Sequence, residues 1–240
     1  ERCGSPFALP LLQHKGLIWP QRGRGIVGNF HAGLPISGPV GAVGRLCWAV
    51  GWSHPEDFAI DIGTFEMLGP HQDQNFTCTF GIPCSLPLLG HGLSHSSEVW
   101  IIGGERLVAA TWEAAALDRS CAAATASDAA SIDGFTNPLM PQQVSDLQAA
   151  YDPGVARAGQ VGPFFRICWR HSQEATFSVE VGRFALQGPQ ATKGFCVKGY
   201  PCNVTLGGFG LNAKNTLRVM DENCSFSNGT DLFMENATDG

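Results

Sequence analysis

Charged residues are scarce in this chain: Asp, Glu, Lys and Arg make up 15% of its 240 residues, and the net charge is −6 at pH 7. Nucleic-acid binding calls for a basic surface, so we expect no nucleic-acid partner. Long apolar runs are also missing. None approaches the roughly 18–20 residues that a membrane-spanning helix needs, and we expect no transmembrane segment.

Short catalytic motifs are missing too. The serine-hydrolase pattern Gly-x-Ser-x-Gly does not occur, and Arg22–Gly25 lacks the Lys-Ser/Thr that completes a phosphate-binding loop. Asp57, Asp61 and Glu66 could supply the two carboxylates of a glycoside hydrolase. Asp61, however, has the parity of an outward residue on a strand, where carboxylates are normally just solvated. We expect no enzyme, no catalytic residue and no cofactor other than covalent N-glycans.

Cysteine and glycosylation sequons are abundant by contrast. Nine cysteines and five Asn-x-Ser/Thr sequons occur in the chain, which begins at Glu1 without a methionine and is either a processed product or a piece of a longer protein. Sugars and disulfides both belong to the secretory route, so we expect a secreted or cell-surface glycoprotein. The sequons stand at Asn75, Asn203, Asn223, Asn228 and Asn236.

One segment of the chain occurs twice. Residues 45–93 and 166–211 share, in order, Arg-Leu/Ile-Cys-Trp, an alternating apolar stretch that ends in Gly-Pro, a Cys-x5-Cys clip and Gly-x-Gly-Leu. Repetition at this length indicates two copies of one supersecondary unit.

The alternating stretch predicts a strand. Phe58, Ile60 and Ile62 alternate with polar or small residues, as on a strand with one buried face. The alternation changes parity at Gly63, and in the second copy at Gly182. A change of parity turns apolar residues to the other face, so we expect a bulge or tight bend where the strand crosses between two sheets.

The cysteines predict disulfides rather than zinc. Five residues between the clip cysteines exceed the usual metal-ligand spacing, and no histidine stands at zinc-finger distance. The economical grouping joins each triplet to the cysteine that follows it and leaves Cys3 free or bonded to another chain. The alternative grouping leaves Cys224 over, and pairing within each group stays open. The first grouping comprises Cys47, Cys78, Cys84 and Cys121, then Cys168, Cys196, Cys202 and Cys224.

Histidines and tryptophans are the remaining candidates for chemistry. His91 and His95 stand four residues apart, but neighbouring glycines oppose a helix, and the second copy has Phe209 in place of His91. We expect loop histidines and no metal. Trp48 and Trp169 are expected in the core beside a disulfide, as in immunoglobulin-like sandwiches. The tryptophans outside the repeat could stack on sugars, as in a lectin; they are Trp19, Trp52, Trp100 and Trp112.

The predicted fold is all-β: two tandem immunoglobulin-like β-sandwich modules, stapled by disulfides, with a short helical insert. The first module spans 1–120, with a repeat core at 45–102 and an Ala-rich insert at 103–126. The second spans 121–240, with a repeat core at 166–224 and a glycosylated tail. Helical spacing of apolar residues within 106–126 predicts the insert.

The repeat resembles a family. The series Arg-Leu-Cys-Trp, Phe-x-Val-Asp-x-Gly ending in Gly-Pro, Cys-x-x-Gly-x-x-Cys and apolar-x-Asp-x-Cys is similar to repeats of very large secreted or surface proteins of protist algae, especially dinoflagellates. The resemblance covers about 45–102 and 166–224, and departs in the Ala-rich insert. It implies an extracellular modular protein without assigned catalytic residues.

These features predict a structural extracellular glycoprotein, a repeat subunit of a fibre, flagellar hair or cell-surface coat. Its partners would be copies of itself, or cell-wall and surface glycans. An adhesin or carbohydrate-binding module is the alternative, and a secreted glycoside hydrolase follows. Residues 221–240 and 1–44 total 64, close to the 63 residues at 103–165, so a neighbouring copy could continue the second unit head to tail.

Overall fold

The computed structural model describes Cys3 and residues 19–21, 29–36, 38–51, 53–103 and 120–220. The chain divides into two compact units, Glu1–Phe209 and Gly210–Gly240. In the described residues it is all-β, with short 3-10 turns at Pro55–Asp57, Cys121–Ala123 and Ala126–Asp128. None of the helical turns in these ranges is long and apolar enough to cross a membrane.

Fourteen strands lie in the described ranges. Their bounds are β1 Trp19–Gln21, β2 Asn29–His31, β3 Val43–Trp48, β4 Ile60–Glu66, β5 Gly69–Pro70, β6 Gln74–Thr79, β7 Pro83–His91, β8 Glu98–Ile102, β9 Ile132–Phe135, β10 Pro141–Val144, β11 Gln148–Gly159, β12 Gly162–Arg170, β13 Val179–Pro189 and β14 Gly208–Phe209.

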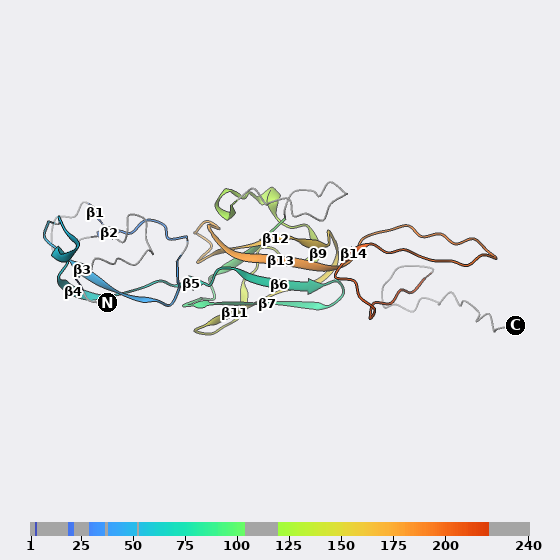
Figure 1. Cartoon of the computed structure of the whole chain (residues 1–240), viewed down its shortest axis with the longest axis horizontal. Helices are drawn as coiled ribbons and strands as arrows, with labels where there is room; N and C mark the ends of the chain where they lie inside the picture. Colours follow the sequence, from blue (N-terminus) through green and yellow to red (C-terminus); the bar gives the residue numbers. More distant parts are fainter. Residues whose placement is uncertain are drawn as a thin grey trace. The chain divides into compact units, whose positions relative to one another are not determined.

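Two five-stranded sheets form one β-sandwich, which we call the central sandwich (Figure 1). In the first sheet β12 lies between β8 and β13, and the far edge of β13 carries β6 and β14. In the second sheet β11 pairs with β7 along one edge and with β9 and β10 along the other. Strand β5 pairs with the far edge of β7. All these pairs are antiparallel except β6 with β13.

The core lies between the two sheets. Alternate residues of β7 and β13 face inward, among them Leu86, Leu88 and Phe184, and Tyr151 of β11 is fully buried with them. The strand β8 is buried on both faces. Its outer face contributes Trp100 and Ile102 to a second cluster, described below. Period-2 burial of this kind is what the sequence alternation predicts.

The predicted bulge is confirmed in both copies. In β12–β13 the register shifts between Ile167 and Cys168, opposite Gly182 and Glu180, so Val181 is the extra residue. Gly182 has φ 157°, which favours glycine. A Cβ at Gly182 would lie 1.9 Å from the backbone oxygen of Gln74 in β6, so glycine also permits close strand approach. The strand does not change sheets there.

The predicted division at 120/121 is not where the structure divides the chain. Strands from both expected modules pair directly, β7 with β11 and β8 with β12. The central sandwich therefore takes residues 69–103 from the first module and 120–189, with β14 at the edge, from the second. The sequence pattern locates the repeat correctly but not its phase, because a repeat unit and a folded unit can begin at different points. The immunoglobulin-like topology stays a prediction.

The helical insert lies mostly outside the described residues. Only its end from Ser120 is described, and there the chain forms the turns Cys121–Ala123 and Ala126–Asp128 rather than an α-helix. Cys121 in the first turn bonds to Cys168. Together with Trp100 and Ile102 this disulfide forms the second buried cluster.

A buried ion pair joins β8 to β12. Arg170 Nε donates to Glu98 Oε2 at 2.8 Å, and the Nη2 atom contacts the same oxygen. Glu98 is 4% exposed. The guanidinium also lies 4.3 Å from the ring centroid of Phe177, a cation–π arrangement. Removing one partner of such a pair would leave a buried, uncompensated charge.

Tyr151 makes the stability of the sandwich sensitive to alkali. Burial raises the pKa of Tyr151 to about 12, whereas an unfolded tyrosine ionises near pH 10. Between these values the unfolded chain has lost a proton that the folded chain keeps, so the free energy of unfolding falls as pH rises, by roughly 2–3 kcal/mol. Denaturant unfolding at pH 9 and pH 12 measures the loss. Tyr151→Phe should lose about that much less, and an equal loss in both proteins would contradict the assignment.

Candidate assembly surfaces

The residues before the central sandwich repeat part of its structure. In β3–β4, Arg45 pairs with Thr64 and Leu46 with Gly63, and the register then shifts between Leu46 and Cys47. The hairpin β12–β13 has the same pairing and shift 121 and 119 residues later. Even the cross-strand ion pair recurs: Arg45 Nη1 to Asp61 Oδ2 at 3.1 Å matches Arg166 to Glu180 at 3.0 Å.

The match extends further towards the N-terminus. In β1–β2, Pro20 pairs with Phe30, as Pro141 pairs with Tyr151 in β10–β11. The disulfide Cys3–Cys47 corresponds to Cys121–Cys168, and the Cα–Cα distance is 5.6 Å in both. We call the described residues within 3–70 the N-terminal half, since they reproduce the 120–189 part of the central sandwich.

The N-terminal half lacks the strands that cover its counterpart. β12 and β13 are flanked by β8 and β6, whereas β3 and β4 pair only with each other in the described part of the chain. Their apolar residues are correspondingly exposed. Ile62 is 61% exposed where its counterpart Val181 is 0% exposed, and Trp48 is 40% exposed where Trp169 is 7%. A two-stranded hairpin is marginally stable alone, and its free edges invite another strand.

Gly63 shows where the missing strand would lie. Its φ of 147° resembles the 157° of Gly182. Gly182 is required because β6 passes against it, yet nothing lies within 4 Å of a Cβ built at Gly63. The N-terminal half thus keeps a glycine that makes room for a strand.

The residues after β13 correspond to the covering strands that the N-terminal half lacks. The clip Cys196–Cys202 repeats Cys78–Cys84, and β14 pairs with β13 as β5 pairs with β7. We call residues 190–220 the C-terminal half, since they correspond to 71–103. Leu217 and Val219 are 64% and 61% exposed, whereas their counterparts Val99 and Ile101 are 1% and 0% exposed.

The cysteine pairing corrects the preferred grouping. The preferred grouping placed Cys121 with Cys47, Cys78 and Cys84, and left Cys3 free or intermolecular, whereas the structure follows the alternative grouping. It bonds Cys3 to Cys47 and Cys121 to Cys168, so each triplet joins the cysteine before it. The reason is that the folded unit begins before Arg-x-Cys-Trp, so it includes the cysteine that precedes each triplet. Cys224 lies outside the described residues.

Peptide mapping of unreduced protein should find these bridges. We expect Cys3–Cys47, Cys78–Cys84, Cys121–Cys168 and Cys196–Cys202. Cys121→Ala with Cys168→Ala should lower the free energy of unfolding of the central sandwich by roughly 2–5 kcal/mol. Cys3→Ala with Cys47→Ala is the matched control and should leave that transition unchanged. A peptide that links Cys121 to a triplet of the first copy would contradict the pairing.

The glycosylation candidates lie at the surface where the structure describes them. Asn75 in β6 and Asn203 beside the second clip are both exposed, so a glycan can be attached without disturbing a core. Asn223, Asn228 and Asn236 lie outside the described residues.

The three candidate carboxylates, Asp57, Asp61 and Glu66, each have a local structural partner. Asp61 pairs with Arg45, and Glu66 Oε1 lies 2.6 Å from His91 Nε2. Asp57 accepts hydrogen bonds from the backbone of Ser53 and His54, which lower the pKa of Asp57. No group of three or more His, Cys, Asp or Glu side chains suited to a metal occurs in the described ranges.

Trp169 lies in the core, as the sequence predicted, but Trp100 takes the predicted place beside the disulfide. Trp169 points into the main core, whereas Trp100 packs beside the Cys121–Cys168 disulfide, 5.2 Å from the ring centroid of Phe177. Alternation explains this, because Cys168 and Trp169 are neighbours on one strand and face opposite ways. Trp100 is therefore unavailable for sugar stacking. Trp52 and Trp112 lie outside the described residues.

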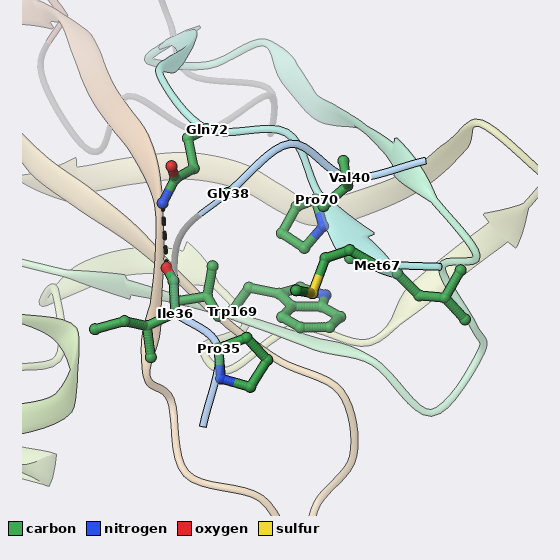
Figure 2. Close-up of a pocket in the computed structure, with 11 residues that line it drawn as sticks. Pro35, Ile36, Gly38, Val40, Met67, Pro70, Gln72 and Trp169 are labelled. Atoms are coloured by element: carbon green, nitrogen blue, oxygen red, sulfur yellow. Dashed lines mark hydrogen bonds between the residues drawn. The ribbon is translucent and has the colours of Figure 1, made fainter. Parts of the chain in front are cut away.

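Figure 2 shows a pocket of about 60 Å³. Trp169 forms its floor, with Pro35 and Met67 beside the ring, and Gln72 Nε2 donates to the Ile36 carbonyl at 3.2 Å. Small-molecule sites usually measure about 300–1,000 Å³. This pocket is a packing gap where Pro35, Ile36 and Val40 meet the central sandwich.

The N-terminal match had a signal in the sequence. Residues 19–48 align with 140–169 without a gap, and both segments have Pro-Gln at the start and Arg-x-Cys-Trp at the end. The positions between them share glycines at 33, 38 and 41 with 154, 159 and 162. Extending the repeat upstream of Arg45 would have located the N-terminal half.

No protein-family model, curated protein or solved structure matches this chain.

Proposed function

We propose that this chain is a structural subunit of an extracellular assembly, such as a fibre, flagellar hair or cell-surface coat, and that its partners are copies of itself. The observation that carries the proposal is the phase of the repeat. In the order of the chain, one complete sandwich comes between two exposed segments, the N-terminal half and the C-terminal half, which together correspond to one further sandwich.

An extracellular location is supported by the four disulfides and the exposed sequons at Asn75 and Asn203. Disulfides persist in oxidising compartments. The resemblance to repeats of large surface proteins of protist algae points the same way.

Self-assembly is tested by sedimentation and negative-stain electron microscopy of the purified glycosylated chain over a range of concentrations. We expect regular elongated particles and a sedimentation coefficient that rises with concentration. A monomer at every concentration would contradict the proposal. Micromolar binding on a glycan array, with no self-association, would favour the carbohydrate-binding alternative.

A further inference from the structure

We propose that the C-terminal half of one copy and the N-terminal half of the next fold together into a second sandwich, in the strand register of the central one. This inference rests on the proposed function and specifies its contact. Within one copy, the two ends of the described chain would then each bind a different neighbour.

The register follows from the central sandwich, in which both halves are present in one chain. There Trp169 pairs with Val99 and Ile167 with Ile101, so Trp48 should pair with Leu217 and Leu46 with Val219 of the neighbour. These four residues are apolar, as their counterparts are. Burying the exposed members removes apolar area from water, the main favourable term in association.

The parallel pairing of β6 with β13 gives the register expected at the other edge, that of β4. In the central sandwich Arg183 pairs with Asn75 and Gly182 with Gln74. The corresponding pairs are Thr64 with Lys193 and Gly63 with Thr192. The incoming strand, residues 192–197, would occupy the open space over Gly63, and its backbone would satisfy the free edge of β4.

A neighbour is the occupant, rather than the same copy, because the halves leave the central sandwich at opposite ends. β5 pairs with the end of β7, at His91 and Gly90, whereas β14 pairs with the end of β13, just past the Gln187–Thr79 pair beside the clip (Figure 1). The nine-residue β7 separates these points, roughly 25–30 Å at strand rise. A head-to-tail contact that does not close generates a filament.

Cross-linking of the full chain tests the register. Thr64→Cys and Lys193→Cys are introduced together at exposed sites, and a short bismaleimide is added without reduction of the native disulfides. We expect a ladder of covalent dimers, trimers and longer species, at least tenfold above the pair Thr64→Cys with Asn212→Cys. Asn212 is equally exposed but corresponds to Ser94, which does not pair with β13. Arg183→Cys with Asn75→Cys, the template pair, is the positive control and should link within one chain.

Mixing two singly substituted chains shows whether a cross-link joins two copies or lies within one copy. Singly substituted Thr64→Cys and Lys193→Cys chains of different mass should give a mixed dimer. A doubly substituted chain that links only to itself would overturn the head-to-tail arrangement. Linking no better than the Asn212 control would overturn the register: elongated particles in the same sample would then leave the proposed function standing, whereas monomers alone would remove both.

Discussion

Val181→Asp is expected to unfold the central sandwich, and Ile62→Asp is expected to leave it folded and prevent assembly. The two residues occupy the same place at the bulge of β13 and β4, but Val181 is 0% exposed and Ile62 is 61% exposed. An unpaired carboxylate in the core costs several kcal/mol in addition to about 1.5–3 kcal/mol of lost apolar burial. That sum is comparable with the ~5–15 kcal/mol that stabilises a domain.

Ile62→Asp changes a surface residue in the monomer, where effects stay within about 0.5 kcal/mol. In the assembly the same carboxylate would be buried beside the neighbour's strand. Near-ultraviolet circular dichroism and thermal unfolding report the sandwich, and sedimentation reports assembly. Ile62→Val is the conservative control and should assemble. Normal assembly by Ile62→Asp would show that this face is not an interface.

Gly182→Ala should lower the stability of the central sandwich, whereas Gly63→Ala should reduce assembly. Both glycines have positive φ, which costs a β-carbon residue about 1–3 kcal/mol. At Gly182 the added Cβ also meets the Gln74 backbone oxygen at 1.9 Å, whereas at Gly63 nothing lies within 4 Å. We expect Gly182→Ala to cost roughly 2–6 kcal/mol in the free energy of unfolding, since overpacking adds about 1–3 kcal/mol to the strain.

Gly63→Ala should leave the unfolding of the central sandwich unchanged but reduce assembly, because the Cβ would then occupy the path of the neighbour's strand. Denaturant titration of both variants, followed by sedimentation of Gly63→Ala, gives the comparison. If both variants lowered the free energy of unfolding of the central sandwich equally, the close approach of β6 would not require glycine at position 182.

The sequence was sufficient for the elements that depend on local chemistry. Alternation from Phe58 predicted β4, and the parity change at Gly63 predicted the bulge, because side-chain direction along a strand is local. The Cys-x5-Cys spacing predicted that Cys78 and Cys84 are oxidised, although it left open whether they bond to each other, as the structure has them. These features need no knowledge of which strands are neighbours.

Strand partners could not be predicted in this way. The pairing of β8 with β12 joins Glu98 to Arg170, 72 residues apart, and the pairing of Cys121 with Cys168 follows from where the folded unit begins. A tandem repeat has the same pattern whichever point is taken as the start. The exposed Trp48 was predicted as a core residue because its pattern matches that of the buried Trp169; only the missing cover strand distinguishes them.

The Glu98–Arg170 pair bears on the fidelity of folding. Strand β3 repeats β12, and residues 216–220 repeat β8. Strand β8 could therefore mispair with β3 of its own or another chain, and residues 216–220 could mispair with β12. The positions equivalent to Arg170 and Glu98 are Ala49 and Thr216, so either exchange would bury one charge opposite a neutral residue. Leaving one partner of a buried pair alone costs about 3–5 kcal/mol, which disfavours the exchanged form by about two to four orders of magnitude. This one ion pair thus favours the pairing of β8 with β12 inside the central sandwich over pairing with the equivalent strand of the N-terminal half or of a neighbour.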